Sequence, residues 1–300
     1  MQIMFDWDDL KVFIAAARTG SLTAAAQRLG VDAATVGRRV SRLESALKST
    51  LLARSPAGLQ LTAAGAQLLA IALDAETAME AAAQVTRPDV IAGTVRISAA
   101  EGFGGAILAP ALPELAAARP GLRVELAASA GFLSPGRREV DMAITLSAPD
   151  EGRLIVEPLT PYQLALYAAP AYLARKPTPA TVEALRSLDV VGYVDDLIYA
   201  PELRYLDEIL PGLTPRLASS SIGAQREIVA GGGGIGVLPC FMAEGLVRVL
   251  PDQVLLERRF WLSTHRDVHD TARLRAVRTW IKALCATGAD RLAPYRSDRA

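Results

Sequence analysis

A short helix, a glycine turn and a capped basic helix near the N-terminus constrain the fold more than any other feature. Ser21 has the N-cap position of a helix over Leu22–Leu29, and Gly30 stands where a left-handed residue commonly ends a helix. Asp32 is the N-cap of a further helix, Ala33–Leu47. The apolar stripe of that helix is formed by Val36, Val40 and Leu43. This order of elements predicts a helix-turn-helix.

Other elements flank this unit. An amphipathic helix over Leu10–Ala17 precedes it, and two short strands, Leu51–Arg54 and Gly58–Thr62, follow it as a hairpin. A long helix rich in Ala and Leu then runs from Ala63 to about Gln84, and residues 89–93 are a predicted linker. A hairpin in this place is typical of the wing of a winged helix-turn-helix.

Charge is distributed unevenly along a chain whose formal net charge is zero. From Arg18 to Arg54 the chain has seven basic residues and two acidic ones, Asp32 and Glu44, which leaves a surplus of five positive charges. A local basic surplus is typical of a surface that binds phosphates. A solvated helix face can carry the same excess, so the charge supports nucleic-acid binding only together with the helix pattern.

Beyond the linker, strands and helices alternate, which predicts a parallel α/β sheet. A glycine-containing loop, Gly102–Gly105, joins the first strand to the first helix. The predicted strands are Thr94–Ala99, Leu122–Ala127, Val140–Leu146, Leu164–Ala168, Val190–Tyr193, Arg216–Ala218, Gly236–Leu238 and Phe260–Thr264. The predicted helices are Ile107–Arg119, Glu202–Ile209, Ile222–Ala230, Met242–Leu246 and Ala272–Ala286.

The chain resembles the LysR-type family of transcriptional regulators, most densely over residues 8–65. Blocks in the order and spacing of that family are Asp9–Phe13, Gly20–Ala26, Leu29–Val31, Val40–Glu44, Leu52–Ser55 and Leu61–Gly65. Looser blocks continue through Gly93–Ile97, Leu108–Pro110, Arg119–Gly121, Val140–Ile144, Pro170–Leu173 and Gly233–Pro239. The recognition helix departs from the family, because its cap is Asp32 and Gly37 stands where a Ser is common.

The resemblance implies an α/β chain with two kinds of domain. Residues 1–65 would form a mainly α winged helix-turn-helix, and residues 66–92 a linker helix and hinge. Residues 93–300 would form an effector-binding domain like the periplasmic binding proteins, with two α/β lobes. By that analogy the first lobe is about 93–161 with 266–291, and the second is about 162–265.

The resemblance implies a sequence-specific, DNA-binding transcriptional regulator, modulated by a small molecule held between the lobes. It places the start of the recognition helix in the major groove, where alanines contact thymine methyls and Thr35 bonds a base edge or phosphate. Its arginines would bind phosphates or guanine, and Arg54 of the wing would enter the minor groove. The predicted DNA-binding residues are Ser21, Thr23, Ala33, Ala34, Thr35, Gly37, Arg38, Arg39, Arg42 and Arg54.

Ligands of such lobes bind at the carboxyl ends of strands, near helix N-termini. The predicted effector-binding residues are Ala99, Ala100, Glu101, Gly102, Phe103, Ser129, Thr145, Tyr193, Ser221 and Ile222. Relatives that bind small carboxylates often have hydroxyls after the first strand. Glu101 stands there in this chain and would repel an anion, so we expect a neutral, cationic or largely apolar effector.

The long helix has an apolar stripe that needs a partner. This stripe, formed by Leu68, Leu69, Ala72, Ala75, Met79 and Ala83, predicts a two-fold helix pair, with packing onto its own domain as the alternative. The expected partners are therefore double-stranded DNA with dyad-like sites, a small-molecule effector and a second copy, in a homodimer or homotetramer. RNA polymerase is a further candidate partner, and no cofactor or metal is expected.

Three motifs have a plainer interpretation than their chemistry suggests. Gly231–Gly236 satisfies G-x-G-x-x-G, but a helix-like segment precedes it, which favours a tight turn at the edge of the cleft. His265 and His269 have metal-ligand spacing, yet His265 follows a strand at the expected lobe crossover, which favours a hinge residue. Cys240 and Cys285 would lie in different lobes as core residues.

Competing classes of protein fit less well. The sequence has no nucleophile elbow, no P-loop and no H-E-x-x-H, which argues against an enzyme. A secreted solute-binding protein would need a signal peptide, and residues 1–9 have three aspartates and no basic residue. No run of about 18 apolar residues lacks a charge. We therefore expect a cytoplasmic protein that is not membrane-bound.

Overall fold

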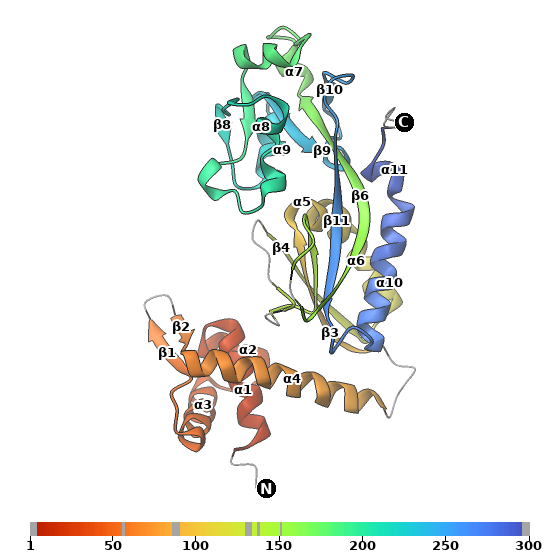
Figure 1. Ribbon diagram of the computed structural model, residues 1–300. Helices are drawn as coiled ribbons and strands as arrows, with labels where there is room; N and C mark the ends of the chain where they lie inside the picture. The colour runs from red at the N-terminus through yellow and green to blue at the C-terminus, as the bar shows by residue number, and fades with distance from the viewer. Residues whose placement is uncertain are drawn as a thin grey trace. The chain divides into compact units, whose positions relative to one another are not determined.

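The computed structural model describes residues 5–55, 58–85, 91–129, 134–136, 139–150 and 152–295. The chain divides into two compact units, Met1–Asp89 and Val90–Ala300, and each has its own hydrophobic core (Figure 1).

Helices and one hairpin make up the described part of the first unit. Its elements are α1 (Trp7–Thr19), α2 (Leu22–Leu29), α3 (Ala33–Leu47), β1 (Leu52–Ser55), β2 (Gly58–Leu61) and α4 (Ala63–Val85). The predicted caps are confirmed, because Ser21 and Asp32 accept backbone N–H groups at the starts of α2 and α3, and Gly30 is left-handed with φ of 68°. Helix α1 begins earlier than predicted because Asp6 caps it.

Helix α1 is buried on two sides, which holds the unit together. One side packs with α2 and α3 in a cluster that includes Val12, Ala25 and Val36. The other side packs with the hairpin strand and α4 in a cluster that includes Phe13 and Leu51. Leu43 of α3 lies in the same cluster as Leu51, and the Glu44 carboxylate accepts from the backbone N–H groups of Leu51 and Leu52, so α3 is joined to the start of the hairpin.

The second unit is built on a mixed sheet, and its long strands β6 and β11 run side by side with α10 packed along them (Figure 1). The strands are β3 (Gly93–Ala100), β4 (Leu122–Ser129), β5 (Met142–Thr145), β6 (Leu154–Ala168), β7 (Val190–Gly192), β8 (Leu217–Ala218), β9 (Ile235–Pro239), β10 (Val247–Val249) and β11 (Leu256–His265). The α-helices are α5 (Glu101–Phe103), α6 (Ala109–Ala118), α7 (Pro170–Leu173), α8 (Tyr205–Ile209), α9 (Ile222–Ala230), α10 (Ala272–Thr287) and α11 (Ala289–Leu292).

Five further turns are helical. They are the π-helical turn η1 (Gly104–Leu108) and the 3-10 turns η2 (Val182–Ser187), η3 (Asp195–Leu197), η4 (Pro201–Leu203) and η5 (Cys240–Met242) among the described residues. The predicted glycine loop 102–105 is wrong, because α5, η1 and α6 form one helical run from Glu101. Gly104 serves close packing instead, since a Cβ there would lie 2.6 Å from that of Ala128. The predicted helix 242–246 is also wrong, because η5 precedes β10 in this region.

The sheet order is β4-β3-β5-β11-β6-β9-β7-β8, with β10 beside β6. The prediction of a parallel sheet is confirmed for β3 with β4 and β5, and for β7 with β8 and β9. It is wrong for β6 and β11, which pair antiparallel with each other and with their outer neighbours. Pro158 and Pro161 obscured the true length of β6, because proline interrupts a strand pattern.

The two long strands link two lobes, one built on β3, β4 and β5 and the other on β7, β8 and β9. Strand β11 pairs with β5 from Trp261 to Thr264, and its register shifts between Phe260 and Trp261. This irregularity lies opposite Thr160 and Pro158 of β6. Both strands therefore pass from one lobe to the other near the aromatic residues Tyr162 and Phe260.

Candidate functional site

Helix α3 has one buried face and one exposed face. Val36, Val40 and Leu43 are at most 5% exposed, and they anchor the helix to α1. The exposed residues on the other face are Ala34, Arg38, Ser41, Arg42 and Ser45. Ser41 and Ser45 were not among the predicted DNA-binding residues, although their helical spacing from Ala34 and Arg38 would have revealed them.

A chain of hydrogen bonds orders the start of α3. The Asp32 carboxylate accepts from the backbone N–H of Thr35 at 2.7 Å and from the Thr35 hydroxyl at 2.7 Å. Nη2 of Arg38 in turn donates to the Thr35 hydroxyl at 2.9 Å. The hydroxyl of Thr35 lowers the pKa of Asp32, so the carboxylate is charged at neutral pH. The Thr35 hydroxyl therefore has two partners within its own helix turn.

Arg42 joins α3 to α1 through a buried carboxylate. Its Nε donates to one carboxylate oxygen of Asp9, and its Nη2 donates to the other at 2.6 Å. Asp9 is only 1% exposed, whereas the side chain of Arg42 remains 60% exposed. Hydrogen bonding to Asp9 raises the pKa of Arg42. The neighbouring Arg39 lies 3.8 Å from the carboxylate of Asp8. Arg42 thus has a structural partner, and its phosphate contact stays a prediction.

The remaining predicted DNA-binding residues lie around the same end of α3. Thr23 is exposed in the first turn of α2, and Ser21 is half-buried as the cap of that helix. Ala33 and Gly37 are half-buried, and a Cβ on Gly37 would meet Leu22 at an ordinary 3.7 Å. The side chain of Arg54 and the hairpin tip at 56–57 lie outside the described residues.

Helix α4 packs on its own unit by one face. Ala72 and Leu73 are buried against α1, Leu68 and Leu69 pack beside them, and Arg18 pairs with Glu76 at 2.9 Å. This part of the predicted stripe, Leu68, Leu69 and Ala72, therefore packs within its own domain, as the alternative prediction stated. Among the side chains of α4 that the structure describes, two large apolar ones are exposed, Ile71 at 66% and Met79 at 56%. Residue 83 of the stripe has no described side chain.

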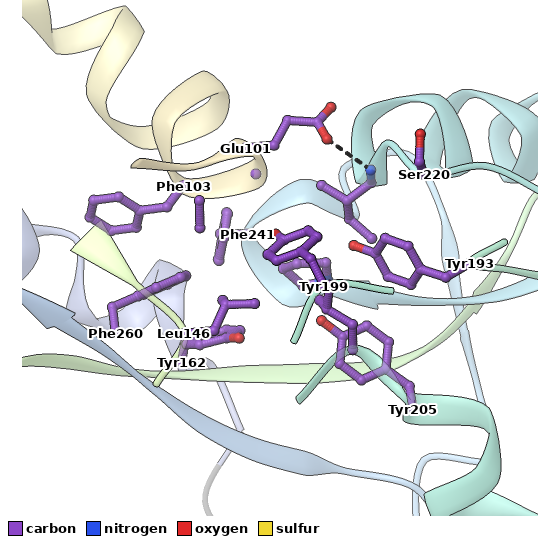
Figure 2. A pocket seen from close by; sticks show the side chains of 15 residues that line it. Glu101, Phe103, Leu146, Tyr162, Tyr193, Tyr199, Tyr205, Ser220, Phe241 and Phe260 are labelled. Atoms are coloured by element: carbon purple, nitrogen blue, oxygen red, sulfur yellow. Dashed lines mark hydrogen bonds between the residues drawn. The ribbon is translucent and has the colours of Figure 1, made fainter. Parts of the chain in front are cut away.

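The second unit contains a cavity between its two lobes, with an empty volume of about 380 Å³ including its open mouth. Figure 2 shows that aromatic side chains from both lobes and both long strands surround it. Its lining consists of Ala100, Glu101, Gly102, Phe103, Leu146, Tyr162, Tyr193, Tyr199, Leu203, Tyr205, Ser220, Ile222, Pro239, Phe241 and Phe260.

Glu101 connects the lobes at the edge of this cavity. Its carboxylate accepts from the Ser221 hydroxyl at 2.5 Å and from the backbone N–H of Gly223 at 3.3 Å. It also accepts from the backbone N–H of Ile222 at 3.1 Å, the hydrogen bond that Figure 2 marks with a dashed line. These groups form the N-terminus of α9, where backbone donors and the helix dipole attract an anion. We name this contact the Glu101 latch, because a first-lobe side chain occupies the anion position of the second lobe.

The phenols around the cavity are held in their neutral form. Burial, together with the smaller effect of the negative charges of Glu101 and Glu202, raises the pKa of Tyr199 to about 12. Burial also raises the pKa values of Tyr162, Tyr193 and Tyr205. Rings pack closely, with Tyr162 stacked on Phe260 at 4.0 Å between centroids. The cavity wall is therefore a closely packed aromatic surface with neutral hydroxyls.

The structure brings together part of the predicted effector set. The predicted residues that line the cavity are Ala100, Glu101, Gly102, Phe103, Tyr193 and Ile222, and Ser221 touches Glu101. Ala99, Ser129 and Thr145 are not among the lining residues. Ala99 is fully buried, and the Thr145 hydroxyl donates to the carbonyl of Ser147 at 2.7 Å.

Sequence reasoning missed most of the aromatic wall. The missed rings are Tyr162, Tyr199, Tyr205, Phe241 and Phe260. They come from the two long strands, from η5, from the segment between η3 and η4, and from the start of α8, rather than from the carboxyl ends of parallel strands. Tyr162 and Phe260 would have been identifiable only once the antiparallel pairing of β6 and β11 was known.

The other motifs have structural roles. The glycine run lies between α9 and β9, which confirms the tight helix-to-strand turn. His269 contacts the Thr264 hydroxyl at 2.6 Å, and burial lowers its pKa. Cys240 and Cys285 are free, and burial raises the pKa of both thiols. In the described residues, no three His, Cys, Asp or Glu side chains are arranged to hold a metal ion. Within the same residues, every helix is too short or too polar to span a bilayer.

Both units of the chain match known protein families. Residues 7–66 match the family model described as bacterial regulatory helix-turn-helix protein, lysR family, and residues 88–286 match the LysR substrate binding domain. The chain is 29% identical over 285 residues to the Mau operon transcriptional activator of Paracoccus denitrificans, covering 94% of this chain and 97% of that protein. It is 28% identical over 296 residues to the HTH-type transcriptional activator TtdR of Escherichia coli K12, covering 92% and 93%.

A solved structure agrees with these matches. The LysR-type regulator CrgA of Neisseria meningitidis aligns with a TM-score of 0.59 and 26% identity, over 92% of this chain and 98% of that one. A helix-turn-helix unit followed by a two-lobed α/β unit defines a ligand-responsive, DNA-binding regulator. The chain belongs to the LysR family of transcriptional regulators, which are not enzymes.

Proposed function

We propose that α3 enters the major groove and that Arg54 of the wing enters the minor groove. The observation that carries this assignment is the exposed face of α3, on which Ala34, Arg38 and Ser41 stand opposite a fully buried stripe. Arg38 and Arg39 would bind phosphates, whereas Thr35 and Ala34 would lie at base edges. In this proposal the DNA-binding domain spans residues 1–65, the linker helix and hinge span 66–92, and the effector-binding domain spans 93–300.

Two copies of the chain would pair through α4 and so set the spacing of two recognition helices. Ile71, Ala75 and Met79 follow one another at intervals of four along one side of α4, so they share a face. This seam replaces the Leu68–Ala72 part of the stripe, which is covered within its own unit. Pairing of sensing domains would extend the dimer to a tetramer. The protein would act in the cytoplasm, where DNA and RNA polymerase are its partners.

The effector would bind in the aromatic cavity and shift a balance between open and closed lobes. The Glu101 latch is one contact that differs between those two states, because it joins residues of both lobes. A ligand that favours one state changes the geometry of the DNA-binding units through α4. We place the crossover between the lobes at the irregularity between Phe260 and Trp261, where the ring of Phe260 stacks on Tyr162.

A matched pair of variants tests the recognition helix. Thr35→Val keeps the side-chain shape but removes the hydroxyl that joins Asp32 to Arg38, so we expect altered base preference with little change on random DNA. Arg38→Ala removes a phosphate contact, so binding to all sequences should weaken and the salt slope should fall by about one. Binding titrations on specific and random duplexes measure both effects. The assignment of α3 fails if both variants bind like the parent.

A second pair of variants tests the α4 seam. Ile71→Asp with Met79→Asp places unpaired charges in the proposed helix pair, which should raise the dimer dissociation constant by at least about a hundredfold. Ala66→Asp adds a charge to an exposed position on another side of α4 and should leave assembly unchanged. Light scattering over a concentration series gives the mass. A double variant that remains as dimeric as Ala66→Asp contradicts the seam.

A further inference from the structure

The charge of the cavity wall is one-sided. Among the described residues that line it, Glu101 is charged, and there is no Lys, Arg or His. An anionic ligand would therefore meet a carboxylate without a balancing cation. The backbone donors that could hold an anion, at Ile222 and Gly223 of α9, already bind Glu101. The cavity thus opposes anions by repulsion and by prior occupation of the helix N-terminus.

The aromatic part of the wall has the opposite preference. The ring pairs Tyr162–Phe260 at 4.0 Å and Tyr193–Tyr205 at 6.0 Å lie in the cavity wall (Figure 2). Of these four rings Tyr193 is half-buried, and the other three are at most 5% exposed. The face of an aromatic ring carries negative potential and attracts organic cations, most strongly where water is excluded. Tyr199 is 38% exposed at the cavity, so its ring can contact an entering ligand.

A second carboxylate belongs to Glu202, which precedes the lining residue Leu203 in the chain. Oε2 of Glu202 is buried and has no hydrogen-bond partner among the described residues. Burial raises the pKa values of Tyr162 and Tyr199, and the negative charge of Glu202 adds to both increases. Arg258 also acts on Tyr162, but its guanidinium is ion-paired with Glu208. A carboxylate oxygen that is removed from water without a hydrogen-bond donor carries a desolvation cost, and a cation nearby would reduce that cost.

We propose that the ligand of this cavity is a small organic cation with an apolar body, held by the Tyr rings and by the field of Glu101 and Glu202. The inference rests on the proposed placement of the effector in this cavity. It restricts the candidate effectors to amines and quaternary ammonium compounds. Its charge would lie against the aromatic faces, and its apolar part would face Leu146, Leu203 and Phe241.

Isosteric probes test the charge directly on the full-length protein. Tert-butylammonium, tert-butanol and pivalate share one apolar body, and benzylammonium, benzyl alcohol and benzoate share another. Isothermal titration calorimetry measures the dissociation constant of each compound. In at least one of the two sets, the ammonium compound should bind at least about tenfold more tightly than the alcohol, and the carboxylate should not bind. Equal binding of ammonium and alcohol, tighter binding of a carboxylate, or no binding of either ammonium overturns the inference.

Two variant pairs separate the ligand class from the site. Tyr199→Leu removes a ring and should weaken the ammonium about tenfold, whereas Tyr199→Phe keeps the ring and should bind like the parent. Glu202→Gln should weaken the ammonium and leave the alcohol unchanged. If an alcohol or carboxylate binds best and Tyr199→Leu weakens it, the cavity is the site and the cation is wrong. If an ammonium binds equally well to Tyr199→Leu and Glu202→Gln, the proposed site itself is wrong.

Discussion

Arg42→Ala is expected to lower the melting temperature of the DNA-binding unit by several degrees and to abolish specific DNA binding. Arg42 donates two hydrogen bonds to Asp9, which is 1% exposed, so its removal leaves a buried carboxylate without its main partner. Loss of this contact weakens the packing of α3 against α1. Because that packing sets the orientation of the exposed face of α3, specific DNA binding is lost with it. Thermal unfolding followed by circular dichroism measures the stability effect.

A compensating variant separates stability from DNA contact. Asp9→Asn in the Arg42→Ala background removes the stranded charge, so the melting temperature should recover in large part. If DNA affinity recovers with it, Arg42 acts only as a structural residue. If the refolded double variant still binds weakly, with a salt slope lower by about one, Arg42 also contacts a phosphate. A melting temperature unchanged in Arg42→Ala alone would contradict the role given to the Asp9 contact.

Glu101→Ala is expected to open the latch and to create an anion site in the same step. The variant loses a charged acceptor for the Ser221 hydroxyl and for the N–H groups of Ile222 and Gly223. Loss of such a cap should lower the free energy of unfolding of the second unit by about 2 kcal/mol. The vacated helix N-terminus should then bind a small carboxylate, because its donors and dipole have no partner.

Acetate is the probe for that vacated position. It should raise the melting temperature of Glu101→Ala by a few degrees and leave the parent unchanged at equal ionic strength, with chloride as the salt control. Glu101→Gln keeps an amide oxygen in place and should lie between the two. Equal stabilisation of parent and Glu101→Ala by acetate, or a Glu101→Ala variant as stable as the parent, would show that the latch has no energetic role.

Local signals in the sequence were sufficient for the first unit. The caps Ser21 and Asp32 and the left-handed Gly30 depend only on residues a few positions away, so the bounds of α2 and α3 could be predicted. The partner of Arg42 could not, because Asp9 lies on another helix. Burial of Leu69 and Ala72 was also inaccessible, since an amphipathic stripe does not reveal whether its partner is the same chain or a second copy.

Long-range pairing limited the prediction of the second unit. Strand ends at Ala100, Tyr193 and Ile222 correctly led to part of the cavity wall, because parallel strands place their carboxyl ends at one edge. Strand β6 was predicted at about a third of its length because Pro158 and Pro161 interrupt its pattern. Tyr162 lies in the part of β6 that was not predicted. Phe260 stood in a predicted strand, but the pairing of that strand with β6 could not be predicted from the sequence.

Binding of the full-length protein to the DNA upstream of its own coding region tests the central account most directly. Fluorescence anisotropy would compare that duplex with a shuffled duplex of equal composition over a series of salt concentrations. We expect the upstream duplex to bind at least about a thousandfold more tightly, and both affinities to fall steeply with salt through phosphate contacts made by residues such as Arg38. Equal affinity for the two duplexes, or affinities that do not change with salt, would contradict a sequence-specific, DNA-binding regulator.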